Sequence, residues 1–128
     1  MSGDFERCWP WLEASLAEGS KLRRPDGSVW LPYEKHHLWQ RILHGRATFW
    51  PGEACAVVTQ LRETSTGIKT QFNWLAGGDL DEIVAMIARI EEISRANGCH
   101  RMQGHGRRGW LRAFTGYHET GTLKEKIL

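Results

Sequence analysis

The sequence concentrates its potentially reactive side chains in one basic segment near its C-terminal end. The members are His100, Arg101, His105, Arg107, Arg108, Trp110 and Arg112. Guanidinium groups pair with phosphates and carboxylates, and an indole ring can stack on a nucleobase. We therefore expect Arg107, Arg108, Trp110 and Arg112 to bind a partner, either another protein or a nucleic acid. In the alternative interpretation Trp110 fills the core, and the arginines are solvated or paired with nearby glutamates.

A second candidate is the glycine pair Gly77-Gly78, which precedes a long helix. The first turn of a helix presents unpaired N–H groups and a positive dipole end, so it favours an anion. Three carboxylates, those of Asp79, Asp81 and Glu82, follow directly. They already complement the dipole and would repel a second anion. Capping of a structural helix is therefore the favoured interpretation of this segment.

Histidines offer a third possibility. His36 and His37 are close in sequence to His44, but no cysteine or carboxylate completes a recognisable ligand set, and we predict no metal site. His100 and His105 could act as general bases, although histidines in a surface turn are usually only solvated. The residues alone therefore assign no catalytic group.

The element that must position these groups is the long helix. Its apolar residues recur at three- and four-residue spacing, which is typical of one buried helix face. Asp79 can cap the first turn in a capping-box-like pair with Glu82, and Asn97-Gly98 is a usual helix end. The apolar stripe consists of Leu80, Ile83, Val84, Ile87, Ile90 and Ile93.

The rest of the chain predicts short elements in a regular order. Pro10 lies inside the first helical pattern and should start or kink that helix. A Pro-Asp-Gly turn marks the connector that follows. We expect helices over 5–18, 33–44 and 108–115, strands over 47–50, 54–61, 68–75 and 99–102, and an extended tail over 118–128 that supplies a last strand.

Composition limits the class of protein. The 128 residues predict one domain over 1–128, and the net charge of +2 is too small to indicate nucleic-acid binding by itself. Three separated cysteines indicate reduced thiols rather than a disulfide framework. The seven tryptophans should mostly fill the core, with at least one free to face a partner. No signal-peptide pattern or apolar run of about 18 residues is present, so we expect a cytoplasmic protein that does not contact membranes.

This order of elements resembles the GNAT N-acetyltransferase fold, in which a long helix packs beneath a splayed sheet. Three segments, GRATFWPGEACAVVTQL, WLAGGDLDE and GC…GRRGW, are similar to segments of GNAT-like proteins from tailed phages and prophages. The resemblance covers roughly residues 33–117. It implies a single α+β domain with a central mixed, mostly antiparallel sheet flanked by helices.

The resemblance also implies an acetyl-CoA site, and the sequence departs from it. The family's loop before the long helix usually reads Q/R-x-x-G-x-G/A, whereas only Gly77 and Gly78 remain here. The middle strands carry no acidic base. Phe114 stands where the family often has a proton-donating tyrosine, and Tyr117 comes after Gly116.

The resemblance and these departures from it together imply a non-catalytic structural, assembly or binding module of a phage particle. It would be made in the host cytoplasm, enter a virion, and contact other virion proteins or copies of itself. The alternative is an acetyl-CoA-dependent N-acetyltransferase acting on an unknown amine, with the cofactor at Gly77 and Gly78. A nucleic-acid-associated protein acting through residues 107–112 is a third possibility.

Overall fold

The computed structural model describes residues 2–105, 113–114, 116–121 and 124–128. Its elements occur in the predicted order through the fourth strand. They are α1 (Gly3–Gly19), α2 (Lys35–Leu43), β1 (Thr48–Pro51), β2 (Cys55–Glu63), β3 (Lys69–Gly78), α3 (Leu80–Ala96) and β4 (Arg101–Gly104).

Two predicted elements at the C-terminal end have different outcomes. The helix expected over 108–115 falls mainly outside the described residues. The described tail residues, 116–121 and 124–128, form no strand, so the expected last strand is absent from this part of the chain. These residues lack the alternation of apolar and polar side chains that holds a strand against a sheet.

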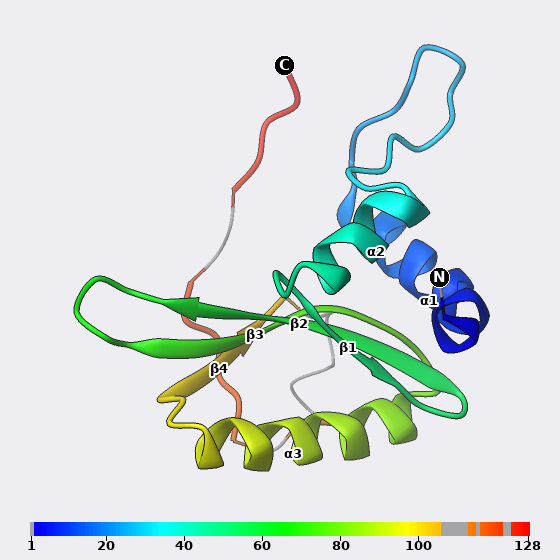
Figure 1. The fold of residues 1–128 in the computed structure, drawn as a ribbon. Coiled ribbons are helices and arrows are strands. Elements are labelled where there is room, and N and C mark those ends of the chain that lie inside the picture. The colour runs from blue at the N-terminus through cyan, green and yellow to red at the C-terminus, as the bar shows by residue number, and fades with distance from the viewer. Residues whose placement is uncertain (1, 106–112, 115, 122–123) are drawn as a thin grey trace.

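The sheet has the strand order β1-β2-β3-β4. β1 pairs with β2 and β2 with β3 in antiparallel fashion, whereas β3 and β4 are parallel. Figure 1 shows α1 and α2 on one side of the sheet and α3 on the other. We call these sides the α1 face and the α3 face. The prediction of an α+β fold with a mixed, mostly antiparallel sheet is confirmed.

Each face of the sheet carries its own core. On the α1 face, Phe5, Cys8, Leu12 and Leu16 form the buried stripe of α1. On the α3 face, the stripe of α3 packs against Cys55 and Val57. Its buried members are Ile83, Ile87, Ile90 and Ser94. Because β2 is sandwiched between both cores, its residues 55–59 are all buried.

Several local expectations need correction. Helix α1 begins at Gly3 and continues through Pro10, so Pro10 does not start it. The predicted stripe of α3 is too long, since Leu80 and Ile93 are 43% and 36% exposed. None of the six described tryptophans is fully buried. Trp30 is exposed, and the others surround the cores half-buried because large rings reach the edges of a small domain.

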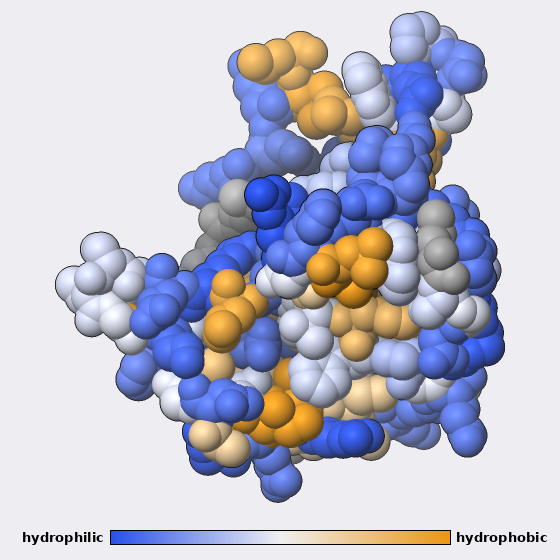
Figure 2. Space-filling model, in the orientation of Figure 1, coloured by the Kyte–Doolittle hydropathy of each residue, from blue (hydrophilic) through white to orange (hydrophobic). Residues whose placement is uncertain are grey.

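The turn predicted for the connector between α1 and α2 is present. It lies at Gly27, whose N–H donates to Arg24 O at 2.9 Å. In the view of Figure 2 the apolar residues form small separate groups among hydrophilic ones. Within the described part of the chain, no helix has the length and apolar character needed to cross a bilayer.

Candidate functional site

Gly77 and Gly78 lie at the end of strand β3 and not in a free loop. They pair with Ala56 and Cys55, so β3 continues to the residue before the cap of α3. A Cβ atom on Gly77 would lie 2.5 Å from Trp11 O, and one on Gly78 would lie 2.3 Å from Ala54 O. Gly78 also has a φ of +108°, a conformation that side chains disfavour. Close packing against α1 and the β1–β2 turn therefore explains both glycines.

The start of α3 is tied to the β1–β2 turn by its own polar groups. Asp79 accepts a hydrogen bond from Glu82 N at 3.0 Å, as predicted for a cap. The Glu82 carboxylate does not return to Asp79 N as in a capping box. It accepts from Ala54 N at 3.0 and 3.1 Å, and Asp79 N donates to Ala54 O at 2.8 Å. A pyrophosphate at this position would meet two carboxylates and donors already in use, so these residues do not fit the phosphate groups of acetyl-CoA.

The free edge of β3 next to this junction is also partly occupied. Ala76 N donates to the Ser15 hydroxyl of α1 at 3.2 Å. An exposed strand edge normally pairs with extended ligands or other strands through such N–H groups. Helix α1 thus covers the end of β3 both at Ala76 and at Gly77.

Two described polar groups, those of Asn73 and Tyr117, lie beside each other where β3 and β4 separate. Asn73 pairs with Gly104, the last residue of β4, and the next residue, Trp74, is skipped in the pairing with β2. Such a bulge redirects side chains and is common next to functional sites. Asn73 Oδ1 and the Tyr117 hydroxyl are both shielded from solvent, and neither has a hydrogen bond of good geometry among the described residues.

The Tyr117 phenol is held in its protonated form. Burial raises its pKa, and the Asn73 amide beside it offsets only part of that rise. Sequence reasoning passed over Tyr117 because it follows Gly116. The chain reversal at Gly116, whose φ is +85°, precedes a Tyr117 ring that packs at 5.9 Å from Phe114 within the α3-face core.

Arg41 lies on the opposite face of this bulge. Its guanidinium is 5.4 Å from the Tyr33 ring centroid and 5.7 Å from that of Trp74. The two rings contact each other edge-to-face at 5.1 Å. Cation–π contacts of this kind fix the orientation of a charged side chain. Arg41 was absent from the sequence prediction because its neighbours in α2 give no motif.

The predicted binding residues Arg107, Arg108, Trp110 and Arg112 all lie outside the described residues, so that prediction stays a prediction. His100 is described and is structural. Its ring Nδ1 accepts from Lys69 N at 3.1 Å, and its backbone N–H donates to Lys69 O at 2.8 Å. His105 packs its ring at 5.5 Å from Phe72.

The structure brings Glu34, His36 and His37 together at the start of α2, with ligand-type atoms within 4.8 Å of one another. Sequence reasoning had paired the histidines with His44 and overlooked Glu34. However, His37 Nδ1 accepts from Glu34 N at 3.2 Å, so the other ring nitrogen of neutral His37 carries the proton. The cluster is better explained as a reciprocal capping box than as a metal site.

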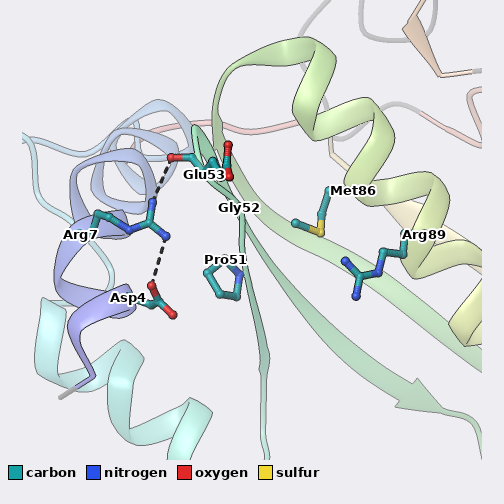
Figure 3. A pocket seen from close by; sticks show the side chains of 7 residues that line it. All are labelled: Asp4, Arg7, Pro51, Gly52, Glu53, Met86 and Arg89. Atoms are coloured by element: carbon teal, nitrogen blue, oxygen red, sulfur yellow. Dashed lines mark hydrogen bonds and ion pairs between the residues drawn. The ribbon is translucent and has the colours of Figure 1, made fainter.

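A separate open hollow of about 530 Å³ lies between α1, α3 and the β1–β2 turn. Figure 3 shows Arg7 and Arg89 on opposite sides of it, with Pro51 and Met86 between them. Arg7 is already engaged, since it bonds to Asp4 at 3.3 Å and to Glu53 O at 3.1 Å. The Arg7 guanidinium is therefore not free to bind a ligand in this hollow.

Cys55 also borders the start of α3, but it is not an activated nucleophile. Burial, with a smaller contribution from the Glu82 carboxylate, raises its pKa to about 12. We expect iodoacetamide at pH 8 to modify half-buried Cys99 well before Cys55 or Cys8 in the folded protein. Peptide mass spectrometry of timed samples would measure this order, and urea-unfolded protein is the control. Rapid labelling of Cys55 in folded protein would contradict the assignment.

The same shift predicts a pH dependence of stability. The folded-state pKa of Cys55 lies above the ordinary thiol value of 9.0, so its contribution to stability is complete below pH 9 and is lost as the pH rises toward 12. Between these values the free energy of unfolding should fall by about 1.4 kcal/mol per pH unit for this group. Urea denaturation at pH 8 and 10 should show a smaller loss for Cys55→Ala than for Cys99→Ala.

Comparison with known proteins supports the fold. Protein-family models and curated proteins give no match to this sequence. A solved structure described as "Crystal structure of a probable acetyltransferase" superposes with a TM-score of 0.59 at 9% sequence identity. The match covers 73% of this chain and 74% of that chain. At this identity the similarity concerns the fold alone.

Proposed function

Starting from this GNAT-like α+β fold, we propose that the chain is a non-catalytic binding or assembly module rather than an acetyltransferase. The observation that carries the proposal is the closed junction between β3 and α3. Glu82 bonds to Ala54 N, Asp79 caps Glu82 N, and Gly77 lies against the backbone of Trp11. A cofactor phosphate could enter this junction only by displacing α1 or the β1–β2 turn.

The proposal includes the setting implied by the resemblance of three sequence segments to segments of tailed-phage and prophage proteins. In this setting the chain is made in the host cytoplasm and joins a particle through other virion proteins or copies of itself. The residues proposed for that contact are Arg107, Arg108, Trp110 and Arg112. Mass spectrometry of purified particles would test the setting, and absence of the chain from them would contradict it.

The test of the non-catalytic role is titration calorimetry with acetyl-CoA at moderate salt. We expect no binding heat up to millimolar ligand, because the carboxylates at the start of α3 oppose a pyrophosphate. A GNAT enzyme measured in the same buffer is the positive control, and circular dichroism verifies that the chain is folded. Micromolar binding would overturn the proposal.

The alternative, an acetyl-CoA-dependent N-acetyltransferase, is favoured by one specific observation. The Tyr117 hydroxyl is buried beside Asn73 near the end of β4, and the phenol keeps its proton at neutral pH. A general acid needs this protonation state. If turnover of acetyl-CoA were found, a loss of activity in Tyr117→Phe with unchanged acetyl-CoA affinity would support this alternative.

A further inference from the structure

Helix α1 contacts only one end of strand β3 on the α1 face of the sheet. Helix α1 contacts β3 at Ala76 and Gly77, near its C-terminal end. Toward the opposite end, β3 side chains alternate, and Gln71 bonds to Ser94 of α3. Thr70 and Phe72 therefore point to the α1 face. Figure 1 shows the β2–β3 hairpin extending beyond α1 and α2.

Strand register places two rows of side chains across this region. Partners opposite one another in a ladder share a face. One row is Arg62, Thr70 and Arg101, and the other is Gln60, Phe72 and Gln103. We call these six residues the basic sheet face. It contains two arginines, two amides and one aromatic ring, and it contains no acidic residue.

Arginine side chains shield the centre of the basic sheet face. The Arg62 guanidinium lies 3.8 Å from the Phe72 ring centroid and bonds to Gln60 at 3.1 Å. Arg101 Nε donates to the Thr70 hydroxyl at 2.7 Å. Phe72 and Thr70 are consequently only 7% and 3% exposed, while both arginines are exposed. The charged groups are thus held against the sheet at fixed positions.

These charges are not neutralised within the described part of the chain. The ion pairs there involve Arg7, Lys21, Lys35, His36 and Arg95, and none involves Arg62, Arg101 or His105. His105, whose ring packs on Phe72, adds an exposed imidazole at the border. A cationic surface without carboxylates favours an anionic partner.

We propose that the basic sheet face binds single-stranded nucleic acid. The exposed guanidinium groups can pair with phosphates, and the Arg62 guanidinium over Phe72 offers a surface on which a base can stack. Gln60 and Gln103 can donate to and accept from base edges. Within the described residues this surface is a sheet that presents no helix to a duplex groove, so unpaired bases are the better fit. This binding is independent of whether acetyl-CoA is bound.

The test is fluorescence anisotropy of a labelled 20-nucleotide oligo-dT with the full chain at 50 and 200 mM salt. We expect micromolar binding that weakens with salt, and roughly tenfold or greater loss in Arg62→Glu/Arg101→Glu. The matched control is Arg24→Glu/Arg89→Glu, which makes the same charge change away from this face and should bind at least several-fold tighter than the first variant. Circular dichroism verifies folding of each variant.

A second variant separates stacking from charge and does not disturb the Arg101–Thr70 bond. Arg62→Lys keeps the charge but loses the planar group, so it should weaken oligo-dT binding severalfold while its salt dependence stays near that of the wild type. Equal binding by both double-charge variants would overturn the proposal. Tighter binding of duplex DNA or of an acidic peptide than of oligo-dT would also overturn it.

Discussion

Replacing Phe5 with alanine should lower the free energy of unfolding by about 3–5 kcal/mol. Phe5 is completely buried in α1, and its ring contacts Trp39 at 4.9 Å and Phe49 at 5.6 Å. Removal of the ring leaves a cavity where α1 joins α2 and β1, because rings from both elements converge there. Urea denaturation followed by tryptophan fluorescence would give the change.

The same substitution should loosen the cover over the end of β3. The amide of Ala76, which bonds to Ser15 of α1, should exchange its hydrogen faster in Phe5→Ala. Phe5→Leu is the matched control, since it keeps most of the volume and should cost less than about 1.5 kcal/mol. Equal stability of both variants would mean that α1 is not held by this ring.

Replacing Gly78 with alanine should cost about 3 kcal/mol or more, because two effects combine. The φ of +108° disfavours any side chain, and the new Cβ would lie 2.3 Å from Ala54 O. Gly77→Ala should cost about 1–3 kcal/mol, since its φ is ordinary but Trp11 O is 2.5 Å from the new Cβ.

Gly19→Ala provides the matched control for both glycine variants. Gly19 ends α1 with nothing within 4 Å of a built Cβ, so its replacement should change stability by no more than about 0.5 kcal/mol. Denaturation midpoints of the three variants would rank these costs. If Gly77→Ala and Gly78→Ala were as stable as Gly19→Ala, the glycines would not serve packing, and a ligand-binding role would return.

These predictions bear on function because GNAT-like folds and acetyl-CoA chemistry are separable. The fold depends on packing of helices on the sheet, whereas the family resemblance would place an acetyl-CoA site in the backbone of the β3–α3 junction. In this chain the same junction is used to attach α1 and the β1–β2 turn. The polar groups that remain, Tyr117 and Asn73, lie elsewhere, near the end of β4.

The strengths and failures of sequence reasoning follow from the range of the interactions involved. The span of α3 was predicted almost to the residue, because Asp79, the apolar stripe and Asn97-Gly98 act within a few residues of one another. The predicted capping-box contact of the Glu82 side chain with Asp79 was wrong. A capping box is the local solution, but Ala54, distant in sequence, offers its N–H instead.

The predicted end of the third strand, at residue 75, was also wrong, because β3 continues to Gly78. Gly77-Gly78 reads as a turn, yet β2 extends the ladder to Cys55 and Ala56 and keeps both glycines in β3. The basic sheet face was not predicted either. Arg62, Phe72 and Arg101 come from three strands, and only their register brings them together.

The sequence by itself determined helices α1, α2 and α3, the order of elements along the chain up to β4 and the α+β class, because local periodicity, caps and turn residues encode them. The tertiary structure decided that Gly77 and Gly78 serve close packing, where Tyr117 lies and which arginines share a face. Each of these depends on contacts between residues far apart in the chain. Such contacts are set by strand register and helix docking, which no local pattern specifies.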